Sequence, residues 1–521
     1  MTSFIRKSAR CLVAVVVATA SLIASSRPAS AGVAVSGGGA SFPQLELDQW
    51  QSATAGKPYS LNILYVPSGS GFGRTSYLSG SLDFGVSDIP FQPEEQSLVN
   101  GSARKNFVYV PVSAGGLGFM YNLTDTNGAR ITNLQLTAHG VCRLLTEPSI
   151  PWNDPEIAAS NPGIALPSND AVPFVRSDNS GTSFVLSEFC IARAPDVWKK
   201  FVTDRVASDG SLAGVPFGQG KPTSSWPLGY GHVSGQFASD GVSDAVASSS
   251  GGANGIGYVE TGFAITKGFP VASVQNAAGK FVQPTAHAVS VALGYARPVA
   301  DGTYTLDYSG SDPTAYFPSS YSYVIAQKDG PADKGLVLAK FLCYAVTKGQ
   351  EVAESLGYAR LSSILVNGAL GKILMINGAP PTAQCAVSST PPPPPPPAAT
   401  TTRPGSVATS SVGGSGSDSG SGSGSGSGSQ TVITDASGST IVVSNSIHSS
   451  GSSGAIGTAV EALPAGTPAG VANLIVQSVK ARRAAQDQPA APEVIWWLAL
   501  GAGLFAAGHA VARSRFVKGS S

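Results

Sequence analysis

The chain has 521 residues, of which 12% are charged, and its formal net charge is +1. This length predicts two or more folded units, or one unit with long tails. The near-neutral charge argues against broad nucleic-acid binding, which needs a basic face, so nucleic acid is not an expected partner.

The N-terminus has the features of a secretory signal peptide. Three basic residues within positions 6–10 precede an apolar run over 11–23, and Ala-Ser-Ala at 29–31 fits a small-residue cleavage site. We therefore expect residues 1–31 to be a signal peptide and the mature chain to be exported.

Residues 32–388 have the composition of a globular domain. Runs typical of strands are found at 61–65, 82–86, 107–112, 117–121, 171–175, 256–259 and 321–325. Runs typical of helices are found at 44–51, 183–192, 332–346 and 349–356. Because the two kinds of run alternate along the chain, the sequence predicts an α/β fold.

Four cysteines remain once the signal peptide is removed: Cys142, Cys190, Cys343 and Cys385. An even number of cysteines in an exported domain predicts two disulfides, and three pairings are possible. The cysteines form no C-x-x-C motif and the five histidines are scattered, so we expect no metal site.

Beyond residue 388 the composition changes. Seven consecutive prolines at 391–397 are typical of a stiff polyproline II rod. The Ser/Gly repeat that follows over 405–429 cannot bury a core. We therefore expect residues 389–454 to be a disordered linker.

A nearly uncharged apolar run lies close to the C-terminus, at 494–511. It is just long enough to span a membrane, with Trp496 and Trp497 at its start and basic residues within 512–521 after its end. This order predicts a transmembrane helix with a cytoplasmic basic tail, preceded by a juxtamembrane region over 455–493. An amphipathic or buried helix is the alternative.

The segment 175–184 combines a fixed positive charge, a carboxylate and two hydroxyls, contributed by Arg176, Asp178, Ser180 and Thr182. A helix-like run follows directly, so Ser180 or Thr182 is expected at a helix N-cap, where backbone N–H groups are free to bind an anion. Arg176 adds a forked donor for an oxyanion. The same pattern also fits an ordinary capped helix with a surface Arg–Asp pair.

Three further segments carry small polar residues next to predicted helices or strands. The Gly-rich segment 37–43 includes Ser41 and Phe42, and the Gly-rich segment 67–73 includes Ser70. Asp88 follows a predicted strand, at the carboxyl edge where α/β folds place ligands. Each of these segments alone is also typical of an ordinary turn.

Enzyme motifs are missing from the sequence. It has no Gly-Lys-Ser/Thr phosphate loop, no complete nucleophile elbow, and no paired acids typical of a glycosidase. We therefore expect a protein that is not an enzyme, with no catalytic residues and no cofactor. A surface phosphatase that uses the same cleft remains the enzymatic alternative.

In combination these segments resemble one family, the phosphate-binding proteins of high-affinity phosphate ABC transporters. The resemblance covers most of 32–361. It rests on Gly-Gly-Gly-Ala-Ser-Phe-Pro at 37–43, Ser-Gly-Ser-Gly at 68–71, Asp-Phe-Gly-Val-Ser-Asp at 83–88, Arg-Ser-Asp-Asn-Ser-Gly-Thr-Ser-Phe at 176–184, Gly-Ile-Gly-Tyr-Val-Glu at 255–260 and Tyr-Phe-Pro-Ser-Ser-Tyr at 316–321. Only the region 205–250 looks longer and richer in Ser and Gly than the family pattern.

The resemblance implies a set of phosphate ligands: Ser41, the N–H of Phe42, Ser70, Asp88, Arg176, Ser180, Gly181 and Thr182. Asp178 would hold Arg176 in place. Asp88 would accept the proton of a protonated phosphate. Because an ionised carboxylate can only accept hydrogen bonds, it disfavours sulfate, which offers no proton near neutral pH.

The resemblance also implies a two-lobed periplasmic-binding-protein fold, type II-like, with the ligand cleft between the lobes. One lobe is expected over 32–109 and 285–388 and the other over 110–284, with 107–121 as a crossing strand. Pairing Cys142 with Cys190 and Cys343 with Cys385 keeps each disulfide within one lobe, so we favour it.

The function that the resemblance implies is extracellular capture of inorganic phosphate and its delivery to the subunits of a phosphate ABC permease. The C-terminal helix would anchor the protein in the plasma membrane at the cell surface. Two alternatives from the binding-protein class remain open: a phosphate sensor or adhesin that kept the fold without transport, and a binder of another oxyanion.

Overall fold

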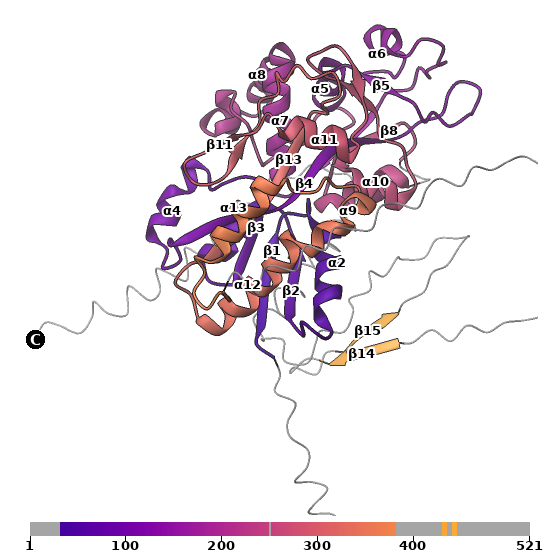
Figure 1. Ribbon diagram of the computed structural model, residues 1–521. Helices are drawn as coiled ribbons and strands as arrows, with labels where there is room; N and C mark the ends of the chain where they lie inside the picture. The colour runs from indigo at the N-terminus through magenta and orange to yellow at the C-terminus, as the bar shows by residue number, and fades with distance from the viewer. Residues whose placement is uncertain (1–31, 249–251, 382–429, 435–439, 445–521) are drawn as a thin grey trace, which may run out of the picture.

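The computed structural model describes residues 32–248, 252–381, 430–434 and 440–444 (Figure 1). Its centre is an eight-stranded mixed sheet in the order β2-β1-β3-β13-β4-β8-β6-β7. These strands are β1 (Ala34–Gly39), β2 (Asn62–Pro67), β3 (Phe84–Ser87), β4 (Phe107–Asn122), β6 (Val172–Arg176), β7 (Ser234–Gln236), β8 (Gly255–Glu260) and β13 (Ser319–Gln327).

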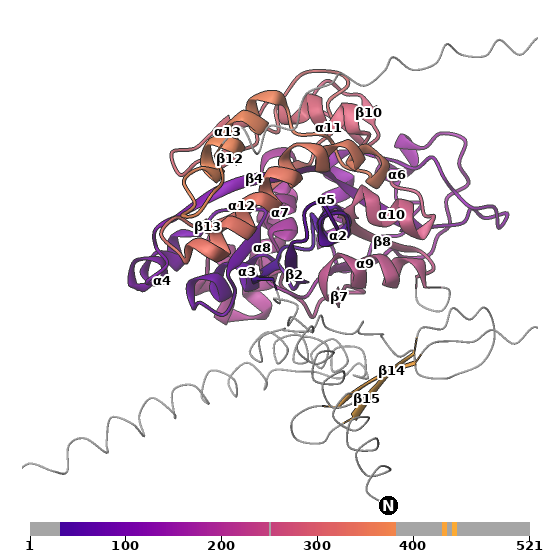
Figure 2. The same cartoon turned by 60° about the horizontal axis from the view of Figure 1, so that its bottom comes forward.

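Helices cover the sheet. They are α2 (Gln44–Ala55), α3 (Ser70–Leu78), α4 (Gln96–Gly101), α5 (Ala138–Thr146), α6 (Pro155–Ser160), α7 (Gly181–Arg193), α8 (Pro195–Ser208), α9 (Ala238–Ala247), α10 (Thr261–Lys267), α11 (Ala286–Leu293), α12 (Ala332–Val346) and α13 (Ser363–Ile373). In Figure 1, α12 and α13 lie near β1 to β4, whereas α5, α7 and α8 gather at the other end of the molecule. Figure 2 shows α9 and α10 beside β8, which both helices contact.

Smaller elements complete the described chain. They are β5 (Gln135–Leu136), β9 (Ser273–Gln275) and β10 (Phe281–Val282) in one sheet, β11 (Arg297–Pro298) with β12 (Tyr304–Thr305), β14 (Gln430–Thr434) with β15 (Thr440–Ser444), and the 3-10 helices η1 (Pro93–Glu95), η2 (Gly210–Gly214), η3 (Pro216–Gln219), η4 (Lys348–Val352) and η5 (Glu354–Leu356). The β14–β15 pair is antiparallel and lies within the predicted linker.

One long strand, β4, joins the two halves of the sheet. It pairs with β13 from Phe107 to Gly116 and with β8 from Leu117 to Asn122. We call β1, β2, β3 and β13 with their helices the first lobe, and β6, β7 and β8 with their helices the second lobe. Nearly all of β4 is buried, as expected for a strand covered on both faces.

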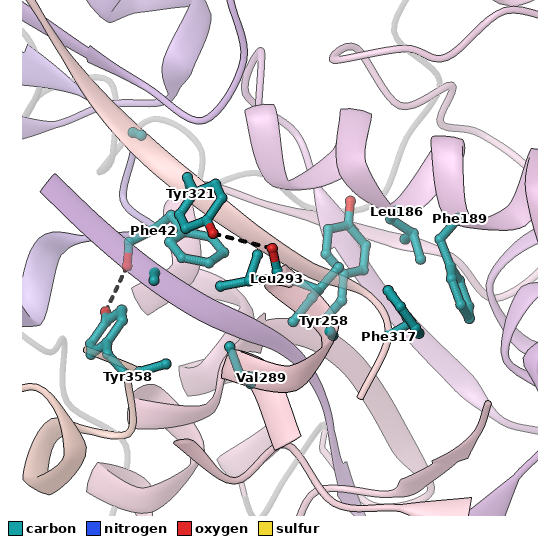
Figure 3. Close-up of a cluster of buried hydrophobic side chains, with 14 of the residues drawn as sticks. Phe42, Leu186, Phe189, Tyr258, Val289, Leu293, Phe317, Tyr321 and Tyr358 are labelled. Atoms are coloured by element: carbon teal, nitrogen blue, oxygen red, sulfur yellow. Dashed lines mark hydrogen bonds between the residues drawn. The ribbon is translucent and has the colours of Figure 1, made fainter. Parts of the chain in front are cut away.

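The hydrophobic core is continuous between the lobes. Phe42 and Tyr358 of the first lobe belong to the same buried cluster as Leu186 and Phe189 of the second (Figure 3). The Tyr358 hydroxyl donates to the Phe42 carbonyl at 2.6 Å, which fixes the loop between β1 and α2. The loop that carries Ser41 is therefore fixed to the hydrophobic core through Phe42 and Tyr358.

The α/β prediction is confirmed, although the structure has many more elements than the predicted runs and differs from them in several places. The runs 107–112 and 117–121 form one strand, β4, which confirms the single strand expected over 107–121. Gly115 and Gly116 between the two runs are extended and let bulky neighbours pack against β4. The predicted helix 349–356 is instead the pair η4 and η5, since the Gln350 side chain bonds to the Val112 and Ala345 carbonyls.

The strand β1 was not predicted, because its Gly-Gly-Gly sequence is typical of a turn. The glycines have a packing reason in the fold. A side chain at Gly37 would collide with the Phe84 ring, and one at Gly39, where φ is +137°, would collide with the Val86 carbonyl. Glycine therefore allows β1 and β3 to pack closely, just before the predicted ligand residues Ser41 and Asp88 that follow these strands.

One predicted disulfide is present. Cys142 on α5 and Cys190 on α7 are bonded, with their Cα atoms 5.7 Å apart, so this pairing is confirmed. Cys343 lies on α12, but Cys385 is outside the described residues, so the pairing of these two stays a prediction.

Several predicted segments lie wholly outside the described residues: the signal peptide 1–31, the juxtamembrane region 455–493, the transmembrane helix 494–511 and the tail 512–521. Within the part of the chain that the structure describes, no helix is both long enough and apolar enough to cross a membrane.

Candidate anion-binding site

The N-terminus of α7 forms one wall of the site. Ser180 is the N-cap, as predicted, and its hydroxyl accepts from the Ser183 N–H at 3.2 Å. The helix begins at Gly181, and Thr182 follows; all three predicted residues are buried. The first N–H groups of a helix have no partner within it, so this end of α7 attracts an anion.

Arg176 ends β6 directly beside the start of α7, and it is 1% exposed. Its Nε donates to Asp178 Oδ1 at 2.7 Å and its Nη2 to Asp178 Oδ2 at 2.5 Å. Burial alone would lower the pKa of Arg176, but the adjacent Asp178 carboxylate outweighs burial and raises it. Arg176 is therefore a permanent cation, held by Asp178 as predicted.

The free side of the guanidinium faces hydroxyl groups. Arg176 Nη1 lies 3.5 Å from Thr182 Oγ1 and 3.3 Å from Ser239 Oγ. Ser239, at the start of α9, was not among the predicted site residues. Its hydroxyl lies 2.8 Å from that of Ser41, and the Ser41 oxygen also accepts from the Ser239 N–H at 3.0 Å. Ser41 of the first lobe and Arg176 of the second thus meet at Ser239.

The first lobe supplies a buried carboxylate. Asp88 follows β3 and is 5% exposed. Ser322 Oγ donates to its Oδ1 at 2.6 Å and Ser70 Oγ to its Oδ2 at 3.2 Å. Burial raises the pKa of Asp88 to about 7; the Ser322 hydrogen bond opposes this shift and the nearby Glu260 charge adds to it. Asp88 can therefore hold or release a proton near neutral pH.

The two walls are in contact. A Cβ atom added at Gly181 would lie 2.5 Å from Ser70 Oγ and 2.7 Å from Asp88 Oδ2. The Gly71 N–H also donates to the Asn179 carbonyl across the lobes, at 2.9 Å. The start of α7 and the Asp88 carboxylate thus face each other in a closed arrangement of the lobes.

The structure brings together Ser41, Ser70, Asp88, Arg176, Ser180, Gly181 and Thr182 of the predicted ligand set. Phe42, of which only the N–H was predicted as a ligand, follows Ser41 and packs its side chain in the core. Three neighbours were missed: Ser239, Ser322 and Glu260. Glu260 ends the motif at 255–260 and Ser322 follows the motif at 316–321, but neither motif alone indicates that these side chains reach the anion site.

The arrangement is suited to holding an oxyanion. Hydroxyls, a forked cation and a helix N-terminus converge, and all are removed from water, which strengthens their electrostatic interactions. Among the described residues, no cluster of three or more His, Cys, Asp or Glu side chains is placed to hold a metal ion.

Comparisons with known proteins identify the family of the chain. Residues 25–347, more than half of the chain, match the model of the PBP superfamily domain. The phosphate-binding protein PstS of Haemophilus influenzae is 27% identical over 336 residues, which are 64% of this chain and 90% of that protein. PstS of Pasteurella multocida is 28% identical over 333 residues, which are 63% of this chain and 86% of that protein.

A crystal structure of a putative phosphate ABC transporter substrate-binding protein from Clostridium perfringens, with bound phosphate, is 13% identical, with a TM-score of 0.40. The match covers 63% of this chain and 100% of that one. The resemblance to substrate-binding proteins of phosphate transporters that the motifs indicated is confirmed by the family match and the PstS relatives. The protein belongs to the PBP superfamily and has its two-lobed fold.

Proposed function

We propose that the protein binds inorganic phosphate between its lobes, outside the plasma membrane, and delivers it to a phosphate ABC permease. The ligand set is the predicted one, joined by Ser239: Ser41, the N–H of Phe42, Ser70, Asp88, Arg176, Ser180, Gly181 and Thr182. No catalytic step is part of the proposal, and the relatives are named as phosphate-binding proteins.

The observation that carries the proposal is the position of Asp88 opposite the start of α7. The Asp88 Oδ2 atom faces Gly181, so an anion bound at the helix N-terminus contacts this carboxylate. A fully ionised oxyanion would meet only a hydrogen-bond acceptor there, whereas a protonated phosphate can donate to it. This difference favours phosphate over sulfate.

Calorimetry on the full-length chain with phosphate and sulfate tests this proposal. We expect wild type to bind phosphate at least ~100-fold more tightly than sulfate. Sulfate gives the buried Asp88 carboxylate no donor and repels its charge, which costs about 3 kcal/mol of binding free energy. Asp88→Asn should narrow this preference by about tenfold or more, since an amide can donate to either anion. Equal affinity of wild type for the two anions would overturn the phosphate assignment and favour another oxyanion.

The lobe boundaries are also proposals. We propose one lobe over 32–109 and 285–388 and the other over 110–284. The change in the partner of β4 from β13 to β8 supports a crossing strand, with the crossing point after Gly116. Closure would then be a hinge motion of β4 and β13 that brings Asp88 to α7.

Export and anchoring complete the proposal. The Cys142–Cys190 disulfide is in keeping with an oxidising compartment, and the sequence signals at 1–31 and 494–511 support export and a C-terminal membrane anchor. The anchor is tested by membrane fractionation: the full chain should sediment with membranes, and a chain ending at residue 493 should be released. A soluble full chain would contradict the anchor.

Growth on limiting phosphate distinguishes a protein that feeds a permease from a sensor or adhesin. If the protein feeds a permease, its deletion should slow growth on limiting phosphate. Normal growth, together with phosphate binding in vitro, would favour a sensor.

A further inference from the structure

The two carboxyl oxygens of Asp88 have different partners. Oδ2 accepts from Ser70 Oγ at 3.2 Å and faces Gly181 at the start of α7. Oδ1 accepts from Ser322 Oγ at 2.6 Å. Ser70 and Gly181 belong to the proposed ligand set, whereas Ser322 does not. Ser322 therefore engages the Asp88 oxygen other than the one that faces α7.

The Ser322 hydroxyl is committed to Asp88. Ser322 lies on β13 and is 0% exposed, so water does not compete for its hydroxyl. A serine hydroxyl has a single proton to donate, and a separation of 2.6 Å is typical of a hydrogen bond to an ionised carboxylate. Such a bond stabilises the charged form of the acceptor. Ser322 thus favours an ionised Asp88, which can only accept.

An irregularity in the sheet lies next to Ser322. The pairing of β13 with β4 shifts by one residue just after Ser322, which leaves Val112 of β4 outside the pairing. The Val112 carbonyl instead accepts from Gln350 Nε2 at 3.0 Å. Register shifts of this kind re-aim neighbouring side chains and are frequent beside functional sites. The sheet is therefore irregular at the point where β13 meets Asp88, in keeping with a local function for Ser322.

The charges around Asp88 make the Ser322 hydrogen bond important. Burial raises the pKa of Asp88 to about 7, and among the interactions that oppose this shift the Ser322 hydrogen bond is the strongest. Loss of the Ser322 hydroxyl would therefore move Asp88 toward its protonated form. The ionisable groups around Asp88 are Glu260 from β8, Arg176 from β6, Tyr65 from β2, Glu188 from α7 and Tyr308 after β12, which line the same cavity, and Arg74 from α3, which contacts the adjacent Ser87.

Resting on the proposed function, we infer that Ser322 is a positioning residue for anion selectivity, which keeps Asp88 an acceptor toward the bound anion. With Ser322 donating to Oδ1, Oδ2 can accept the P–OH proton of phosphate, and sulfate meets no donor. Without this hydroxyl, Asp88 takes up a proton more readily. A protonated Asp88 can donate to sulfate, so the preference for phosphate narrows.

Sulfate is the probe for this inference, because it does not titrate near neutral pH. Ser322→Ala in the full-length chain is compared with wild type by calorimetry, with sulfate competing against phosphate. At pH 8.5 we expect the variant to bind sulfate about tenfold more tightly than wild type does, since the loss of a hydrogen bond to a charged group shifts its titration by about one pH unit. At pH 6, where Asp88 is protonated in both proteins, this gain should disappear. Phosphate affinity should change much less, because phosphate can supply the proton itself.

Ser113→Ala is the matched control. Ser113 lies opposite Ser322 in the pairing of β4 with β13 and is also 0% exposed, but its hydroxyl lies near the Glu46 carboxyl. The control removes the same group from the same part of the sheet, and it should bind sulfate as wild type does at both pH values. Ser322→Thr keeps the hydroxyl and should keep the wild-type preference for phosphate.

A loss of affinity for both anions by one factor at both pH values in Ser322→Ala would mean that Ser322 only supports the fold, and the inference would be wrong. A sulfate gain of equal size in Ser113→Ala would overturn it as well. If Ser322→Ala does not fold, Ser322→Cys replaces it: a thiol is a weak donor, so a smaller gain at pH 8.5 is expected, and no gain contradicts the inference. If wild type binds no phosphate at any pH, the proposed function itself fails.

Discussion

The two walls of the site differ in what they contribute. The second-lobe wall carries the fixed charge of Arg176, locked by Asp178, and the capped start of α7. The first-lobe wall carries Asp88, whose pKa of about 7 lets it exchange a proton. A permanent cation attracts any oxyanion, whereas a titrating acceptor distinguishes protonated from unprotonated ones. In the proposed function, attraction and selection would therefore belong to different lobes and would combine when the lobes close.

The largest effect on phosphate affinity should follow from Arg176→Met, which removes the positive charge of the second-lobe wall. This change removes the cation and leaves Asp178 buried without its partner, at a cost of about 3–5 kcal/mol. We expect phosphate affinity to fall by about two to three orders of magnitude, measured by calorimetry.

Arg143→Met is the control, because Arg143 also forms forked contacts in the second lobe, with Glu147 and Asp154, and neither partner belongs to the ligand set. Its loss should lower stability and leave affinity within about twofold. A comparable loss of affinity in both variants would contradict a specific role for Arg176.

The disulfide should separate stability from binding within the second lobe. Replacing Cys142 and Cys190 by Ala removes the cross-link between two residues that are 48 positions apart. The loop-entropy model gives a loss of about 4 kcal/mol in the free energy of unfolding. Denaturant unfolding should show this loss, while phosphate affinity under native conditions stays unchanged. A loss of affinity in the folded double variant would indicate that the disulfide shapes the start of α7.

Closure of the two walls is tested with Gly181→Ala. The added methyl group would press on Ser70 and Asp88, so the lobes could not close fully. We expect a loss of about 1–3 kcal/mol in binding, or roughly tenfold to one hundredfold in affinity.

Gly210→Ala, where the new Cβ atom would meet nothing within 4 Å, should bind as wild type does. Wild-type affinity in Gly181→Ala would show that the walls do not approach each other in the bound state.

The last prediction concerns the pH dependence of stability away from the ligand set. Burial raises the pKa of Glu46 from 4.5 to about 8, so the folded state holds this proton more tightly than the unfolded state. The resulting stabilisation is complete below pH 4.5 and is lost as pH rises toward 8, by at most ~1.4 kcal/mol per pH unit.

Glu46→Gln should remove this part of the slope in denaturant unfolding at several pH values. The same pH slope in the variant and in wild type would show that Glu46 is not the group responsible.

Local patterns in the sequence were sufficient for some features of the molecule. The N-cap at Ser180, the Arg176–Asp178 pair and α12 were predicted, because each depends on residues within a few positions of one another. Features that depend on distant packing were not. Ser239 reaches Ser41 across 198 positions, and Ser322 reaches Asp88 across 234, so no local pattern could indicate them.

The region 205–250 illustrates the same limit. The sequence showed there only a greater length and more Ser and Gly than the family pattern, but in the structure Phe217, Trp226 and Tyr230 pack with Phe201 in an aromatic cluster. These aromatic residues are spread over positions 201–230 and show no regular spacing. Only the fold brings them together, next to the helix that follows α7.

The central claim, that one anion is bound by both walls at once, is tested most directly by a crystal structure of the protein grown with phosphate. We predict tetrahedral density between Arg176 and Asp88, with oxygens within hydrogen-bond distance of Arg176 Nη1, the N–H groups at the start of α7, and an Asp88 carboxyl oxygen. Density that touches Arg176 but leaves Asp88 without contact, or density outside the space between the lobes, would contradict the account.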